Sequence, residues 1–151
     1  MKWTGLRFLM LIGLLLWPLS SYAANRPLNL LLLRDVICEK ESAGAKNRDW
    51  AFNGYQDVGR CQVRWDTAYS IGGFERDRSP GDLFVRDTNE RVAWNIIIRC
   101  VAKWKRATPY LVGFCYHGGL YRKVSKGTPW DTYALDIQKR YTERERETVL
   151  R

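Results

Sequence analysis

The sequence predicts a single compact domain that is mainly α-helical, with a small β or irregular insertion. Its 151 residues, 46% of them hydrophobic, are enough for one core and too few for two. Apolar residues recur at three- and four-residue steps in several segments, which is the spacing of an amphipathic helix. Residues 47–65 are instead rich in turn-forming types, and they predict the insertion.

The N-terminus has the pattern of a secretory signal peptide. Basic residues precede an apolar run, Phe8–Leu19, and small side chains at Ser21 and Ala23 fit a cleavage site. The run is short for a bilayer span. We therefore expect residues 1–23 to be removed and residues 24–151 to form the mature domain in the periplasm. An uncleaved N-terminal anchor is the alternative.

The first helix of the mature domain is predicted to open at Pro27 and to stop at Gly44. One face of this helix carries a row at three- and four-residue steps: Leu30, Leu33, Ile37 and Glu41. Glu41 ends the apolar row, whereas Glu39 lies on a mixed one. A carboxyl at the edge of an apolar wall has its charged form disfavoured, which makes Glu41 a candidate proton donor. By periodicity alone, a solvated glutamate at a fraying helix end is the favoured alternative.

The rest of the chain predicts further helices and loops in a simple order. The pattern indicates a hairpin or irregular loop at 47–65, a short helix at 66–73, a polar loop at 74–82, a strongly amphipathic helix at 88–106, a buried helix or turn at 108–120 and a final amphipathic helix at 128–151. The helix at 88–106 has an apolar row formed by Val92, Ile96, Cys100 and Trp104.

All four cysteines lie in the mature part of the chain: Cys38, Cys61, Cys100 and Cys115. An even number of cysteines in an exported domain predicts two disulfides, and three pairings are open. A zinc site is the weaker alternative, because no two cysteines are closely spaced and His117 is the only histidine. We expect no metal and no cofactor.

The formal net charge of +9 indicates attraction to anionic polymers and surfaces, such as cell-wall glycans, lipid headgroups or nucleic acid. Charge alone does not choose among these partners. No nucleic-acid-binding motif accompanies the charge, so we expect no nucleic-acid partner.

Four motifs in order carry a resemblance to a known family. They are Glu41-Ser42, then G-R-C-Q-V at 59–63 with Thr-Ala at 67–68, then D-L-F-V-R-D-T-N at 82–89, and Y-H-G-G at 116–119. This set resembles the soluble-type lytic transglycosylase domain of the lysozyme superfamily, which reads E-S, G-L-M-Q-I-x-P-x-T-A, D-L-F-D-P-x-x-N-I and Y-N-A-G. The longer stretch N-G-Y-Q-D-V-G-R-C-Q-V is similar to enzymes attached to secretion, conjugation and pilus systems.

The resemblance implies a lysozyme-like α+β fold and cleavage of the MurNAc–GlcNAc bond of peptidoglycan. Glu41 would act first as acid and then as base, giving a 1,6-anhydro product without a second carboxylate. Tyr116 would hydrogen-bond Glu41, Gln62 would line the sugar cleft, and Ser42 would cap the helix or bond near the glutamate. The resemblance thus implies that Ser42, Gln62 and Tyr116 belong to the substrate-binding site. Expected partners are peptidoglycan strands and components of a secretion, conjugation or pilus machine.

The sequence departs from the family pattern at several positions. Arg60-Cys61 replace Leu-Met, and His117 replaces the asparagine of Y-N-A-G. Asp57 and Asp66 lie near the motifs, and we interpret them as solvated loop residues because no apolar row stands behind them. The alternatives are a muramidase that uses water and a catalytically weak, peptidoglycan-binding assembly factor.

Overall fold

The elements of the chain are seen in a computed structural model, which describes residues 27–150. The expected signal peptide, residues 1–23, lies outside the described part. The described chain forms α3 (Leu30–Glu41), η2 (Arg48–Trp50), β1 (Asp57–Val58), β2 (Val63–Arg64), α4 (Trp65–Ser70), η3 (Pro80–Phe84), α5 (Arg86–Ala102), α6 (Pro109–Gly118) and α7 (Pro129–Val149). The predicted mainly helical fold with a small β insertion is confirmed.

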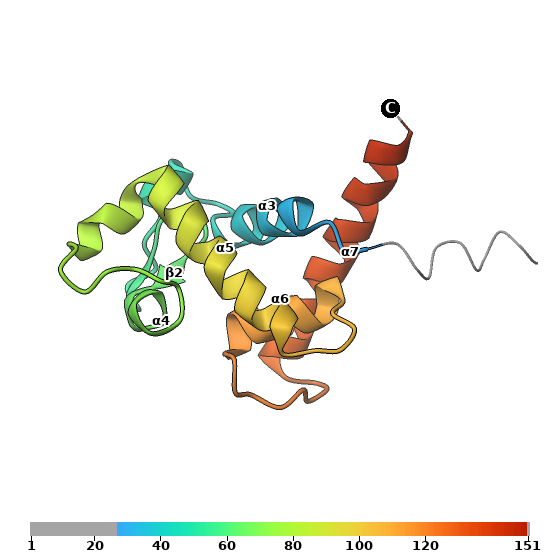
Figure 1. Cartoon of the computed structure of the whole chain (residues 1–151). Helices are drawn as coiled ribbons and strands as arrows, with labels where there is room; N and C mark the ends of the chain where they lie inside the picture. Colours follow the sequence, from blue (N-terminus) through green and yellow to red (C-terminus); the bar gives the residue numbers. More distant parts are fainter. Residues whose placement is uncertain (1–26, 151) are drawn as a thin grey trace, which may run out of the picture.

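Helix α5 runs diagonally through the molecule and organises the other elements around it (Figure 1). The hairpin, α4 and η3 lie towards its N-terminal end, and α6 and α7 lie towards its C-terminal end. The predicted apolar row is confirmed for Val92, Ile96 and Cys100, which are all buried. The helix ends at Ala102, so Trp104, the predicted last member of the row, lies beyond it.

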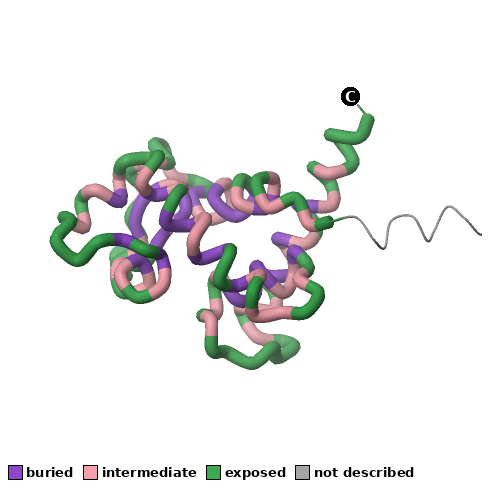
Figure 2. The backbone as a smooth tube through the Cα atoms, in the orientation of Figure 1, coloured by how far each residue is buried: buried purple, intermediate pink, exposed green. Residues whose placement is uncertain are grey.

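Helix α3 starts later than its sequence predicts. It begins at Leu30 and not at Pro27, because the side chain of Asn29 accepts a hydrogen bond from the backbone amide of Leu32 and caps the first turn. Leu33 and Ile37 of the predicted row are completely buried. Figure 2 shows a buried stretch of α3 where this helix lies beside α5. The apolar face of α3 therefore ends at Glu41, as the spacing indicates.

The insertion at 47–65 is a short antiparallel hairpin. Asp57 pairs with Arg64 and Val58 with Val63, and a four-residue turn at 59–62 joins the two strands. Two strands of two residues each have little stability of their own. The hairpin must therefore be held by contacts with the helices.

A disulfide between Cys38 and Cys61 joins the hairpin turn to α3, and a second one between Cys100 and Cys115 joins α5 to α6. The prediction of two disulfides is confirmed, with one of the three open pairings realised. The described residues contain no helix that is long and apolar enough to cross a membrane.

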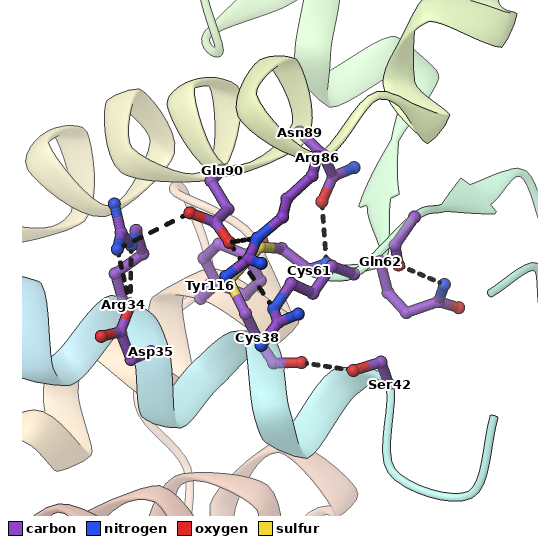
Figure 3. Close-up of a disulfide and its surroundings, with 12 residues drawn as sticks. Arg34, Asp35, Cys38, Ser42, Cys61, Gln62, Arg86, Asn89, Glu90 and Tyr116 are labelled. Carbon is purple, nitrogen blue, oxygen red and sulfur yellow. Dashed lines mark hydrogen bonds and ion pairs between the residues drawn. A yellow bond between two sulfur atoms is a disulfide. The ribbon is translucent and has the colours of Figure 1, made fainter. Parts of the chain in front are cut away.

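The buried side chain of Asn89 on α5 also holds the hairpin (Figure 3). Its Oδ1 accepts from the backbone amide of Cys61 at 2.8 Å, and its Nδ2 donates to the carbonyls of Val58 and Leu83 at 2.8 and 2.9 Å. Gly59 makes this approach possible: its φ is +75°, and a Cβ there would lie 2.5 Å from Asn89 Nδ2. The amide thus joins α5 to strand β1, to the turn that connects the two strands and to η3.

Charged side chains support the same junction from the outer side. The guanidinium groups of Arg34, Arg60 and Arg86 lie 3.7, 3.6 and 2.9 Å from the carboxylate of Glu90. These arginines come from α3, the hairpin turn and α5. Arg60, which departs from the family pattern, therefore has a structural partner in Glu90.

We predict that Asn89→Ala will lower the free energy of unfolding by about 2–4 kcal/mol, because three buried backbone groups lose their partner. Chemical denaturation measures the change. Asn95→Ala is the matched control on the same helix: Asn95 makes one part-buried bond, to the carbonyl of Gly72, and its loss should cost about 1 kcal/mol. Equal costs for the two variants would contradict a special role for Asn89.

Candidate active site

A cleft of about 410 Å³ opens where the end of α3, the hairpin, the start of α4 and the end of α6 meet. Three of the predicted site residues, Glu41, Gln62 and Tyr116, line this cleft. They come from three separate elements and are 21 to 75 residues apart in sequence. The fold therefore brings together residues that the sequence pattern could relate only by their order.

Glu41 is the last residue of α3, and its side chain is only 14% exposed. Its Oε1 lies 3.7 Å from Nδ1 of His117, which stands on the last turn of α6 with 42% of its side chain exposed. The carboxylate of Glu41 is therefore shielded on one side by the protein core, and the imidazole of His117 borders it on the solvent side. It is not the solvated helix-end glutamate that periodicity alone favours.

Tyr116 lies beside Glu41, but its hydrogen bond differs from the predicted one. Its hydroxyl donates to the backbone carbonyl of Cys61 at 2.9 Å. Because a hydroxyl has one proton, it does not also donate to Glu41, and that part of the prediction is wrong for this structure. Burial, followed by the charges of Glu41 and Asp57, raises the pKa of Tyr116 well above its usual value. The phenol therefore stays protonated and can still accept a hydrogen bond.

Two side chains next to Glu41 were not identified from the sequence as site residues. The ring of His117 stacks on Tyr133 of α7, with centroids 4.3 Å apart and planes at 10°. The hydroxyl of Tyr133 is buried and forms no well-aligned hydrogen bond within the described chain. Burial, followed by the charge of the nearby Glu41 carboxylate, raises the pKa of this hydroxyl well above its usual value. The departure Y-H-G-G was a signal for His117. Tyr133 gave none, because an aromatic on an amphipathic helix usually belongs to the core.

Ser42 does not line the cleft, which contradicts its prediction as a substrate-binding residue. It is buried, and its Oγ donates to the carbonyl of Cys38 at 2.8 Å, so it satisfies the end of α3. The capping part of its prediction is confirmed. The hydroxyl therefore supports Glu41 by ending the helix in a defined way.

Gln62 lies in the hairpin turn with a left-handed φ of +46°. Its Nε2 donates to the carbonyls of Ala51 and Gly59 at 3.0 and 2.9 Å. No described residue donates to its Oε1, which leaves that oxygen to accept from a ligand in the cleft. The bonds of the amide nitrogen hold this acceptor in place.

Asp57, Arg64 and Asp66 also line the cleft. The carboxylate of Asp57 accepts from the side chain of Asn53, and that of Asp66 lies 3.3 Å from Arg64. The interpretation of the two aspartates as solvated loop residues is right about the exposure of Asp66 but wrong about its element, because Asp66 lies in the first turn of α4. It is incomplete for Asp57, which is half-buried in the wall of the cleft.

The arrangement can hold and exchange a proton at a shielded carboxylate inside an open cleft. Within residues 27–150, no cluster of three or more His, Cys, Asp or Glu side chains could hold a metal ion. Comparison with protein-family models, curated proteins and solved structures finds no significant match.

We predict that removing the hydroxyl will affect stability differently at the two tyrosines beside Glu41. Tyr116→Phe leaves the carbonyl of Cys61 without a partner and should lower the free energy of unfolding by about 1 kcal/mol. Tyr133→Phe removes a buried hydroxyl that lacks a full hydrogen bond, so stability should stay the same or rise. Thermal and chemical denaturation test the pair. A large loss for Tyr133→Phe would mean that its hydroxyl has a strong partner.

Proposed function

We propose that the protein is a peptidoglycan lytic transglycosylase with a lysozyme-like fold, acting in the periplasm. One observation supports the proposal most: Glu41, Gln62 and Tyr116, which the family resemblance selects from three distant motifs, line the same cleft. Asn89, from the remaining motif, holds the hairpin that forms one wall. An accidental match of short motifs would not be expected to converge in this way.

Glu41 is the proposed acid and base. In the first step its carboxyl proton goes to the glycosidic oxygen, and the bond between that oxygen and C1 of MurNAc breaks. The N-acetyl carbonyl of the same sugar stabilises the positive charge at C1. In the second step the 6-hydroxyl of that sugar attacks C1, and its proton returns to Glu41. The product is a 1,6-anhydro ring, and no water is consumed.

The surroundings of Glu41 suit this double role. A carboxyl that is 14% exposed is kept from bulk water but stays open to a ligand in the cleft. The protonated hydroxyls of Tyr116 and Tyr133 are close enough for the carboxylate to raise their pKa values. Such neighbours limit the directions in which the carboxyl can turn. The enzyme would open local gaps in the wall for a secretion, conjugation or pilus machine.

A muramidase is the second candidate, and the position of Asp57 favours it. Hydrolysis needs a group that directs a water molecule, usually a second carboxylate. Asp57 lines the same cleft as Glu41, and the charges of both carboxylates raise the pKa of Tyr116. Both candidates use Glu41 as the acid. They differ in the chemistry of the sugar end that is produced.

We predict that Glu41→Gln will keep the fold and lower the cleavage of purified peptidoglycan by at least about 10²–10⁴-fold, because the titrating proton is lost. Glu39→Gln is the matched control two residues away. Glu39 faces α7, where its carboxylate lies 2.7 Å from Arg144, and it does not line the cleft. Its activity should stay close to that of the wild type. Equal losses in both variants would refute the assignment of Glu41 as the acid.

The products distinguish the two candidate reactions. Mass spectrometry of the released muropeptides should show 1,6-anhydro ends, each lighter by one water than the hydrolysed form. Reducing ends would instead identify a hydrolase, and Asp57→Asn should then abolish the reaction as well. Wall binding without cleavage by the wild-type protein would favour the assembly-factor alternative.

A further inference from the structure

We propose that two neighbouring loops form a basic face that binds the surface of an anionic lipid bilayer. The loops are 103–108, between α5 and α6, and 119–128, between α6 and α7. The basic face is defined by six cationic side chains: Lys103, Lys105, Arg106, Arg122, Lys123 and Lys126. This inference is independent of the proposed activity, because it rests on charge and exposure outside Glu41 and its neighbours.

The two loops are joined by direct contacts. Lys103 donates from Nζ to the backbone carbonyl of Arg122 at 2.8 Å, and Arg122 donates from Nε to the carbonyl of Gly118. The guanidinium of Arg122 also lies over the ring of Trp130, 3.7 Å from its centroid. These contacts hold the second loop against the first. The six cations therefore belong to one surface rather than to two separate loops.

The positive excess of the described chain is concentrated in this basic face. The chain has 25 Lys and Arg and 16 Asp and Glu. Four of the cations lie outside residues 27–150 and six lie in the basic face, so the remaining 15 nearly balance the 16 acidic residues. A net charge that came from a generally basic surface would be spread over all elements. Here it marks one end of the molecule.

The cations of the basic face form no close ion pairs within the described chain, although, after the hydrogen bond from Tyr110, the charge of Lys126 helps to lower the pKa of Asp131. Within residues 27–150, none of the six lies within ion-pair distance of a carboxylate. The nearest acid along the chain, Asp131, accepts from the hydroxyl of Tyr110 and the backbone amide of Gly127. The basic face can therefore attract an anionic surface without first breaking internal pairs.

Exposed apolar side chains favour a lipid surface over a charged polymer. Residues 121–127 are all exposed, and they include Tyr121 at 91% and Val124 at 38% exposure. This loop forms the lowest part of the view in Figure 2. An aromatic and an aliphatic side chain between cations are suited to the boundary of headgroups and acyl chains. A polyanionic chain could hold the cations and stack on the tyrosine ring, but it would leave the aliphatic Val124 in water, whereas a bilayer accepts both apolar groups.

The basic face adjoins the cleft. Gly118, Gly119 and Leu120 line the cleft, and the chain then continues directly into the exposed part of the second loop. Binding through this face would therefore hold one end of the cleft towards the bilayer. The proposed surface thus sets the orientation of the site as well as its location.

Co-sedimentation of the exported protein with lipid vesicles tests the proposal. One set contains phosphatidylglycerol and phosphatidylcholine in equal parts, and the other contains phosphatidylcholine alone. The difference between the sets isolates electrostatic binding, since any contribution of the apolar segment 8–19 is common to both. We expect binding to the anionic vesicles that weakens as salt is added. Equal binding to both sets would overturn the proposal.

Two triple variants with the same change in net charge locate the surface. The first replaces Lys105, Lys123 and Lys126 with glutamate, and the control replaces Lys46, Arg76 and Lys139, which are exposed and form no ion pairs within the described chain. Each basic residue near an anionic surface contributes about fivefold to partitioning, so the first triple should lose at least about 100-fold. The control should change much less. Equal losses would refute the assignment to these loops.

A third variant separates a bilayer from an anionic polymer. Tyr121→Ser with Val124→Ser keeps all six cations and should weaken vesicle binding about tenfold, because the apolar contacts are lost. Unchanged vesicle binding by this variant would contradict the lipid assignment. So would a first triple variant that keeps its vesicle binding but loses binding to cell-wall sacculi. All replaced side chains are exposed, and circular dichroism should show an unchanged fold.

Discussion

The position of the candidate site depends on the buried amide of Asn89. A hairpin with two residues in each strand does not hold itself, and this amide gives it two hydrogen bonds from α5, one to β1 and one to the turn, and a third to η3. The disulfide from Cys38 to Cys61 then joins the turn to α3, three residues before Glu41. The carbonyl of Cys61 in turn receives the hydroxyl of Tyr116. The amide, the disulfide and the tyrosine hydroxyl together fix the hairpin turn against α5, α3 and α6.

The surroundings of Glu41 keep most of the bulk water away from its carboxylate without burying the carboxylate completely. Two elements contribute its neighbours: α6 with Tyr116 and His117, and α7 with Tyr133. The hydroxyl of Tyr133 gains no full hydrogen bond in this position. A buried polar group that is not fully satisfied costs stability, and such costs are common where a side chain serves a site rather than the core. His117 covers the remaining, solvent-facing side by stacking on that same tyrosine.

The basic face adjoins one end of the cleft. The cleft lies between the hairpin and the end of α6, and the loop that follows α6 carries half of the basic face. Outside that face, the acidic and basic residues of the described chain, 27–150, nearly balance. A partner attracted to the basic face would therefore meet the protein in a limited range of orientations, with the open end of the cleft near the contact.

The sequence by itself determined the helical class, the core row of α5, the burial of Leu33 and Ile37 and the presence of two disulfides, because these follow from local periodicity and from cysteine number. It also singled out Glu41 over Glu39, since a helix places only one of them on the apolar row. The tertiary structure alone decided the disulfide pairing and the bond of Tyr116 to Cys61. It also decided that Ser42 lies outside the cleft and that Tyr133 lies beside Glu41. Each of these depends on contacts between elements that are distant in sequence. Such contacts are set by how the helices and the hairpin pack, and no local pattern contains that information.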